Sequence, residues 1–156
     1  MQRQQRRERQ KAVAKPGEEE RFEQFNPLTS AIIGAAMRVD DELGPGLYEE
    51  VCHRCMEREL SDLHLAWRSE VPLPVVYRGE LVDEEGYRLD MLIADTVILE
   101  LKSIEAVLPR HEKQLGTYLK LAHKPIGLLI NFNVDILRNG IRRIINPRWQ
   151  SEGGRA

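Results

Sequence analysis

The chain has 156 residues, the size of one domain, and its 42% hydrophobic and 31% charged residues are typical of a soluble globular fold. Its formal net charge of -2 excludes a bulk polycation, so a nucleic-acid partner would have to be met by local basic patches. No apolar run approaches the ~20 residues that a membrane-spanning helix needs, and two cysteines provide no disulfide framework. We therefore expect a cytoplasmic protein that does not enter a membrane.

The N-terminal part divides into a polar segment and two helical segments. Residues 1–25 lack hydrophobic periodicity and are rich in Gln, Arg and Glu, which predicts a disordered charged arm. An Asn-Pro pair then opens a predicted helix over residues 26–43, with apolar residues along one side. A Gly-Pro-Gly run at 44–46 ends that helix, and a second helix is predicted over residues 47–60.

The rest of the chain has mostly strand character. The strand-like segments are 63–71, 73–79, 86–94, 96–103, 125–133 and 140–146. Pro109 opens one further predicted helix, which reaches about residue 122. This order predicts an α/β (α+β) fold in which helices flank one central mixed β-sheet. We expect a single domain over residues 26–148 and a flexible C-terminal tail over residues 149–156.

Two charged residues interrupt the apolar strand at 96–103. Because alternate residues of a strand share a face, Glu100 and Lys102 lie on the side of Ile98, while Leu99 and Leu101 lie on the other. Apolar residues on both faces predict a central, covered strand. A carboxylate and an ammonium group are costly there unless they pair, bind a metal or line a cleft. The alternative is a strand end whose charged groups reach solvent.

The preceding strand carries an acidic residue in a similar place. Asp90 lies ten residues before Glu100, so a hairpin turning near Asp95 would bring the two side by side. With a two-residue loop Asp90 would pair with Leu101 and face away, whereas an odd loop or a bulge puts it on the face of Glu100 and Lys102. We therefore predict an odd connection. Two adjacent carboxylates repel each other unless a cation lies between them, and Mg²⁺ or Mn²⁺ is the natural candidate.

Candidate site residues also occur on two of the predicted helices. At 100° per residue Glu49 falls on the apolar side of its helix, although a glutamate at a helix start is also favoured by the helix dipole. His111, Gln114 and Tyr118 share one face of the helix after Pro109. A stripe at the edge of the core is the simpler explanation for Tyr118. An amide on an apolar edge, such as that of Gln114, needs polar partners.

Other polar groups have simpler explanations. Cys52 and Cys55 form a C-x-x-C motif without a second pair of ligands, so we interpret them as core residues. Strand alternation places Arg142 and Arg143 on opposite faces, which favours a solvated surface over a single phosphate-contacting rim. The basic residues of the N-terminal arm would add nucleic-acid affinity that does not depend on sequence.

The spacing of Asp90 and the run Glu100-Leu101-Lys102 resembles the Asp…(Glu/Asp)-x-Lys core of the PD-(D/E)XK nuclease superfamily. Three blocks extend the likeness, LGPGLYEEVCHRCMEREL, GYRLDMLIADTVILELKSIEAVLPRHEKQLGTYLKLA and IGLLINFNVDILRNGIRRIIN. In this order they are similar to the bacterial GxxExxY proteins of that superfamily, over residues 28–147. Cys52 stands where the GxxExxY motif usually has tyrosine.

The resemblance implies a restriction-endonuclease-like core with a divalent metal, Mg²⁺ or Mn²⁺. It implies that Asp90, Glu100 and the backbone carbonyl of Leu101 bind the ion, with Glu49 as a further acidic group. Lys102 would then orient or activate the attacking water and offset charge on the phosphate. By the same resemblance Gln114 and Tyr118 lie near the site and position water, the lysine or the substrate backbone, with His111 beside them.

Two functions follow from these expectations. The first is a metal-dependent nuclease that hydrolyses phosphodiester bonds in nucleic acid, DNA rather than RNA. The second is a noncatalytic nucleic-acid-binding or assembly subunit that retains the nuclease fold. The intact set of Asp90, Glu100 and Lys102 favours the first. A protein of this size would need a homodimer or a partner protein to grip its substrate, and fold alone does not decide function.

Overall fold

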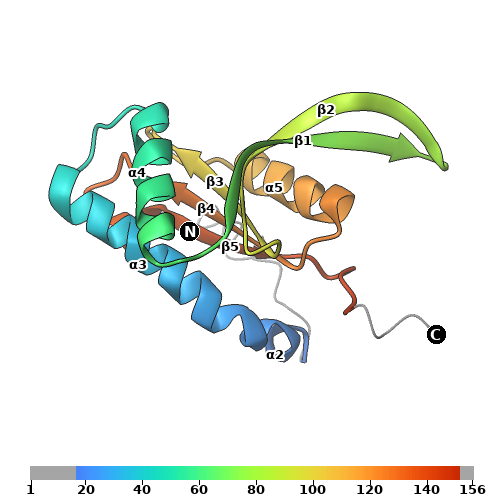
Figure 1. The fold of residues 1–156 in the computed structure, drawn as a ribbon, viewed down its shortest axis with the longest axis horizontal. Coiled ribbons are helices and arrows are strands. Elements are labelled where there is room, and N and C mark those ends of the chain that lie inside the picture. The colour runs from blue at the N-terminus through green and yellow to red at the C-terminus, as the bar shows by residue number, and fades with distance from the viewer. Residues whose placement is uncertain (1–16, 152–156) are drawn as a thin grey trace, which may run out of the picture.

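The apolar segments of the chain build one five-stranded sheet, with strands in the order β1-β2-β3-β4-β5 (Figure 1). The computed structural model describes residues 17–151. The strands are β1 (Trp67–Tyr77), β2 (Glu80–Ile93), β3 (Val97–Lys102), β4 (Ile126–Asn131) and β5 (Ile141–Ile145). β3 and β4 run parallel and the other neighbouring pairs run antiparallel. The predicted central mixed sheet is therefore confirmed.

Helices cover both faces of this sheet. They are α2 (Glu18–Phe22), α3 (Asn26–Leu43), α4 (Glu49–Asp62) and α5 (Pro109–Ala122), with the short 3-10 segments η1 (Glu23–Phe25) and η2 (Leu137–Gly140). The predicted bounds of the first and third long helices agree with α3 and α5, while α4 begins and ends two residues later than expected. In the part of the chain that the structure describes, no helix is long and apolar enough to cross a membrane.

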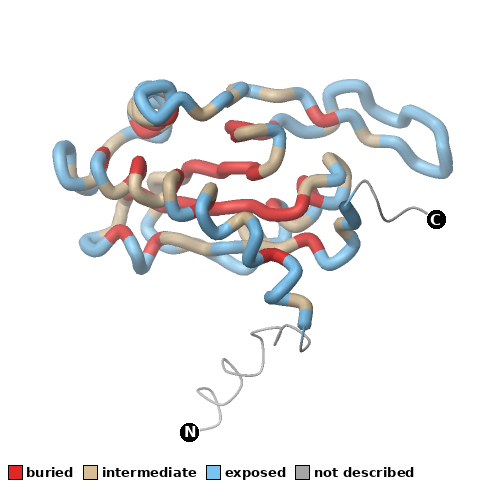
Figure 2. Tube along the Cα trace, turned by 60° about the horizontal axis from the view of Figure 1, so that its bottom comes forward, coloured by how far each residue is buried: buried red, intermediate tan, exposed pale blue. Residues whose placement is uncertain are grey.

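Side-chain alternation in β3 and β4 separates two hydrophobic cores. Leu99 and Leu128 pack with α3 and α4 on one face of the sheet, whereas Ile98 and Leu129 pack with α5 on the other. Every residue of β4 is buried, as is all of β3 except its last residue, and Figure 2 shows the central strands as the most buried part of the trace. The prediction that β3 is a covered central strand is confirmed, and Glu100 lies on the α5 face.

The connection between β2 and β3 has an odd length, as predicted. Ile93 pairs with Val97 and leaves three residues in the loop. Ala94 and Asp95 have φ angles of 50° and 51°, and the amide of Thr96 donates to the carbonyl oxygen of Ile93 over 3.0 Å. These are the features of a type I′ turn, whose twist suits a hairpin. Continuing this register along both strands places Asp90 opposite Glu100.

In the middle of strands β1 and β2, the side chains change the face of the sheet to which they point. Met91, opposite Ser69, packs in the α3–α4 core, whereas Leu89, opposite Val71, packs in the α5 core. In a regular strand, residues two positions apart lie on the same face and would pack in the same core. The change occurs at Glu70, which has a φ angle of 54° and stands opposite Asp90. Beyond it the hairpin projects from the body of the molecule (Figures 1 and 2).

The N-terminal boundary differs from the prediction. The expected arm reached residue 25, but residues 18–25 are helical and Phe22 is fully buried. The rings of Phe22 and Phe25 lie 6.0 and 5.3 Å from the ring of Trp149, and Arg21 donates to the Trp149 carbonyl oxygen. Aromatic contacts between the two ends of the chain therefore order a segment that looks polar by composition. Trp149, the first residue of the tail expected over residues 149–156, makes these contacts, and residues 1–16 and 152–156 lie outside the described range.

Candidate active site

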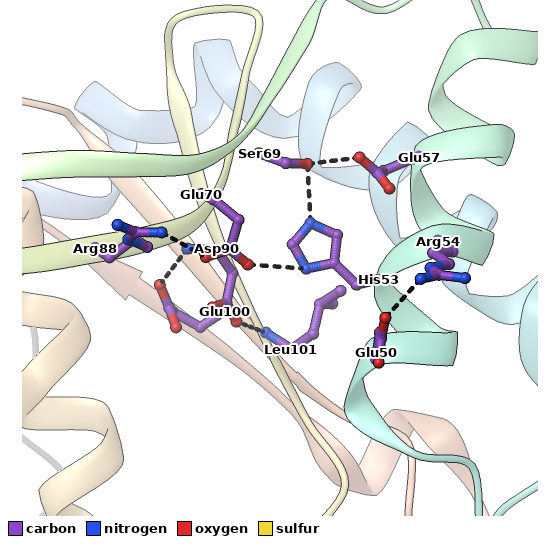
Figure 3. A network of polar contacts seen from close by, with 10 residues as sticks. All are labelled: Glu50, His53, Arg54, Glu57, Ser69, Glu70, Arg88, Asp90, Glu100 and Leu101. Atoms are coloured by element: carbon purple, nitrogen blue, oxygen red, sulfur yellow. Dashed lines mark hydrogen bonds and ion pairs between the residues drawn. The ribbon is translucent and has the colours of Figure 1, made fainter.

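Where the pairing of β2 with β3 ends, two carboxylates accept backbone amides that no longer bond to the neighbouring strand's carbonyls. The ladder between these strands ends at the pair of Met91 and Leu99. One residue further, the amide of Leu101 donates to Oδ2 of Asp90 over 2.9 Å, and the amide of Asp90 donates to Oε1 of Glu100 over 3.2 Å. Figure 3 shows both contacts. The side chains of Asp90 and Glu100 are thus fixed side by side by the backbone of each other's strand.

The Glu100 carboxyl group lies in an environment that opposes its ionisation. Its residue is only 6% exposed. Burial, followed by the charge of Asp90, raises the pKa of Glu100 to about 9, although the charge of Lys102 acts in the opposite direction. A proton or a metal cation is therefore strongly favoured between the two carboxylates.

Lys102 follows Glu100 on the same face of β3 and is half-buried. Besides its effect on Glu100, its charge contributes to lowering the pKa of His111, after burial and the charge of Arg110. The charge of Lys102 therefore acts both on the carboxylates and on the beginning of α5. The ammonium group is on the α5 face of the sheet, where strand alternation placed it.

The end of β3 is tied to the start of α4. The amide of Ser103 donates to Oε1 of Glu49 over 3.3 Å, and the Ser103 hydroxyl donates to the Leu47 carbonyl oxygen. Glu49 is exposed, so the expectation that it points into the interior is wrong. It is the first residue of α4 and lies at the sheet edge, whereas Met56 and Leu60 of the same helix are buried.

A pocket of about 460 Å³ opens between α4 and the strands. Glu49, Asp90 and Leu101 all line it. The structure therefore brings Glu49 to the same opening as Asp90, although it does not bury Glu49 beside the central pair of carboxylates.

The α5 residues of the predicted stripe have different surroundings. Tyr118 is 6% exposed, and burial followed by the charges of Glu100 and Asp90 raises its pKa to about 12, so its phenol lies close to both carboxylates. Gln114 is exposed one turn earlier on the helix. His111 accepts the Leu108 amide through Nδ1 over 2.8 Å and so caps the start of α5. This capping contact accounts for His111 without a role in chemistry.

The backbone adds an oxygen to the two carboxylates. In a strand the N–H and C=O groups of one residue point to the same side. Because the Leu101 amide faces Asp90, the Leu101 carbonyl faces the same opening. The Lys102 carbonyl faces the other way and accepts the Phe132 amide over 2.9 Å.

These donors suit a hard cation. Among residues 17–151 no group of three or more His, Cys, Asp or Glu side chains is arranged to hold a metal. Asp90, Glu100 and the Leu101 carbonyl instead offer an all-oxygen set that leaves positions for water. Mg²⁺ binds in this manner, through one or two carboxylates and several waters.

A polar network that the sequence did not indicate lines the same pocket (Figure 3). The Ser69 hydroxyl donates to Oε2 of Glu57 over 2.8 Å and lies 2.9 Å from Nε2 of His53. Nδ1 of His53 lies 3.8 Å from Oε1 of Glu70, whose Oε2 lies 3.8 Å from Arg88. The one available signal was the i, i+4 spacing of Glu49 and His53 on α4. Ser69 and Glu70 gave no signal.

The cysteine and arginine interpretations agree with the structure. Cys52 is fully buried, and burial raises its pKa to about 11, while Cys55 is half-buried and both thiols are free. Arg142 lies 3.7 Å from Glu112 of α5, whereas Arg143 donates to Asn26 of α3 over 3.1 Å. The two arginines therefore lie on opposite faces of the sheet.

Comparison with protein families identifies a match. The family profile described as the PD-(D/E)XK nuclease superfamily matches residues 26–144, which include β1 to β4, all but the last residue of β5, and the helices α3, α4 and α5. Comparison with curated proteins and with solved structures gives no match.

Proposed function

Because the chain belongs to the PD-(D/E)XK nuclease superfamily, we propose that it is a metal-dependent nuclease that hydrolyses phosphodiester bonds in DNA rather than RNA. One observation carries the proposal. Asp90 and Glu100 are held side by side by backbone amides, in surroundings that oppose their joint ionisation, and Lys102 lies beside them. A structural ion pair would need one carboxylate, whereas phosphate chemistry uses two carboxylates, a cation and a lysine.

The roles of the residues follow from their positions. Asp90, Glu100 and the Leu101 carbonyl would hold Mg²⁺ or Mn²⁺, and Glu49 would add negative charge at the pocket opening. When bound, the ion supplies a lower pKa for an attacking water and stabilisation of charge on the phosphate oxygens. Lys102 orients that water and offsets phosphate charge as a compact cation.

The α5 residues would complete the site. Tyr118, buried within electrostatic range of the carboxylates, would exclude bulk water from that side of the site. Gln114 is exposed one turn away and is free to contact the substrate backbone. His111 is left with its helix-capping contact.

Within the superfamily we assign the chain to the GxxExxY proteins, with residues 26–148 as the nuclease domain. The contact of Glu49 with the end of β3 supports this assignment, since it gives the glutamate of that motif a place at the proposed site. Cys52, which replaces the motif's tyrosine, is buried against the α3–α4 core. The replacement therefore changes packing and leaves the proposed metal ligands in place.

A second candidate is a noncatalytic nucleic-acid-binding or assembly subunit. The observation in its favour is that the Glu49 carboxylate accepts the Ser103 amide and does not form a three-carboxylate group with Asp90 and Glu100. Under this hypothesis the site would bind metal weakly and would not cut nucleic acid.

Calorimetry and cleavage together test the proposal. Titration of Mg²⁺ and Mn²⁺ into the wild type, Asp90→Ala and Asp62→Ala measures metal binding, and labelled single-stranded, duplex and branched DNA and RNA measure cleavage. Asp62 is a matched control because it lies at the far end of α4 from Glu49 and pairs with Arg58 on the surface. We expect wild type and Asp62→Ala to bind metal and cut DNA, and Asp90→Ala to do neither. A wild type that binds no metal even with DNA present would favour the second candidate.

A further inference from the structure

A second pocket, of about 640 Å³, lies at the other end of the sheet from the carboxylates. Its walls come from the β2–β3 turn, the end of α5 and the chain after β5. Strand β3 runs from this end to Glu100, and at about 3.3 Å per residue the two places are roughly 15 Å apart. The pocket is therefore separate from the proposed active site.

Positive charge predominates in this pocket. Lys120, Lys124 and Arg148 line it, and the acidic residue among its lining is Asp95, which pairs with Nζ of Lys124 over 2.9 Å. Within the described residues the side chains of Lys120 and Arg148 have no hydrogen-bond or ion-pair partner. Unpaired cations that converge on a concave surface attract an anion.

The walls of the pocket are held rigidly. The amide group of Asn146, which is 3% exposed, donates to the carbonyl oxygens of Leu119 and Lys124 over 3.2 and 3.0 Å. Its Oδ1 accepts the backbone amide of Arg148 over 3.1 Å. Asn146 thus joins the end of α5 to the C-terminal segment. The cations are presented from a preorganised frame, which lowers the entropic cost of binding.

An aromatic ring completes the lining. Trp149 borders the pocket, and its ring packs against those of Phe22 and Phe25. The indole is half-buried, so part of it stays accessible. Cations next to an accessible aromatic ring suit a nucleotide, whose phosphate needs positive charge and whose base stacks on rings.

The surface of α5 connects this pocket to the proposed active site. At 100° per residue, Arg110, Lys113 and Lys120 lie on the side opposite the buried Leu115. The helix begins beside Lys102 and ends at the pocket, a length of about 21 Å at 1.5 Å per residue. A strand whose phosphate lies at Lys102 can therefore follow the basic face of α5 to the pocket.

We propose that this pocket binds a nucleotide unit of the substrate strand, with its phosphate between Lys120 and Arg148 and its base against Trp149. That the ligand is a strand of nucleic acid rests on the proposed nuclease function. The evidence for an anion-binding pocket does not depend on that function. The pocket fixes the strand about one helix length from the bond that is cut, and so sets a minimum length for tight binding.

Fluorescence of Trp149 tests the proposal. The chain has two tryptophans, so Trp67→Phe leaves Trp149 as the only indole, and Asp90→Asn in the same protein prevents cleavage. The probes are single-stranded oligothymidylates of increasing length, thymidine monophosphate and inorganic phosphate. We expect a saturable change in Trp149 fluorescence, with affinity rising once the oligonucleotide is long enough to span α5.

Two paired variants show whether the pocket carries the binding. Lys120→Ala with Arg148→Ala should weaken oligonucleotide binding about tenfold or more and lower the slope of log affinity against log salt by about 0.7 for each lost phosphate contact. The control is Arg38→Ala with Arg58→Ala, which removes two surface arginines, from α3 and α4, that already pair with Glu59 and Asp62. It should leave affinity within about twofold and the slope unchanged.

The outcomes separate this proposal from the proposed function. If the two double variants bind alike, or if Trp149 does not respond to an oligonucleotide that binds, the pocket is not a strand site, while cleavage by the wild type still stands. Inorganic phosphate binding as tightly as the long oligonucleotides would also overturn it in favour of a free-anion site. A response of Trp149 that is lost in the Lys120 and Arg148 variant supports the pocket even if the wild type cuts nothing.

Discussion

The two halves of β2 have very different surroundings, although they belong to one continuous strand. From Leu89 to Ile93 every residue except Asp90 is buried, between α3 and α4 on one side and α5 on the other. From Glu80 to Arg88 every residue except Gly86 is exposed, on a hairpin that projects from the body of the molecule. Each half carries acidic residues, so residue type alone does not distinguish them.

The difference shows where a charge indicates function. Asp83 and its neighbours on the projecting half are solvated, and Oδ1 of Asp83 accepts the amide of Glu85 in a local turn. Asp90 lies at the boundary, where its carboxylate accepts the Leu101 amide and a second carboxylate is adjacent. A solvated carboxylate has no desolvation cost and therefore does not indicate a functional site. A carboxylate held against another one is destabilised unless a cation lies nearby.

The largest effect should distinguish the two halves by activity. Asp90→Ala and Lys102→Ala should each reduce single-turnover DNA cleavage by at least about a hundredfold, because each removes charge at the reacting phosphate. Asp83→Ala, on the same strand, should cleave within about twofold of wild type. If Asp83→Ala and Asp90→Ala lost activity equally, the boundary at Asp90 would have no functional meaning.

The next effect concerns packing. Leu99→Ala removes a fully buried side chain from the α3–α4 core and should lower the free energy of unfolding by about 2 to 5 kcal/mol. Leu81→Ala, at a residue 54% exposed on the projecting hairpin, should change it by less than about 1 kcal/mol. Urea unfolding followed by circular dichroism measures both. Equal losses would mean that the hairpin packs against the body in solution.

A third effect is the dependence of stability on pH without metal. Because the pKa of Glu100 rises from 4.5 in the unfolded chain to about 9 in the fold, the folded state binds more protons between these values. The contribution of this group is therefore fully present below about pH 4.5 and is lost as pH rises through about 9. Glu100→Gln should remove this loss and stabilise the metal-free protein by about 1 to 3 kcal/mol at about pH 8.

Thermal unfolding in the presence of a chelator measures this effect across pH. Glu84→Gln is the control, since Glu84 is exposed on the projecting hairpin and should leave the pH profile unchanged. A Glu100→Gln protein with the wild-type profile would show that Glu100 ionises freely in the fold. The same variant should bind Mg²⁺ more weakly, because an amide lacks the negative charge of the carboxylate.

Local rules were sufficient for the part of the site that lies on adjacent strands. Strand parity and the ten-residue spacing of Asp90 and Glu100 require an odd loop, and the loop has three residues. Apolar residues on both faces of β3 likewise predicted its central place in the sheet. Both inferences depend only on the period of a strand, which tertiary structure does not alter.

Features set by distant contacts were not predictable in this way. The helical wheel predicted that Glu49 points into the interior. Its carboxylate instead accepts the amide of Ser103, 54 residues away, at the exposed end of the sheet. The ordering of Phe22 depends on Trp149, at the other end of the chain. Glu70 adopts a left-handed backbone conformation at the bend of the hairpin, which the conformational preference of glutamate does not favour. In each case the decisive partner lies far away in sequence.

The smallest expected effect on stability is at Glu70, where the side chains of the hairpin change the face of the sheet to which they point. Glu70 has a φ angle of 54°, a conformation that costs a residue with a side chain about 1 kcal/mol or more and glycine almost nothing. The contacts of Glu70 with His53 and Arg88 are 3.8 Å long and its side chain is 55% exposed, so they contribute little. Glu70→Gly should therefore change the free energy of unfolding by less than about 0.5 kcal/mol.

Val71→Gly, one residue along the same strand, is the matched comparison. It replaces a half-buried residue that packs on the α5 core and has no positive φ angle to relieve, so it should cost about 1 to 2 kcal/mol. Urea unfolding of both variants under one set of conditions gives the difference. If Glu70→Gly were the more damaging change, the bend would be held by the Glu70 side chain and not by the packing of Leu89 and Met91 into opposite cores.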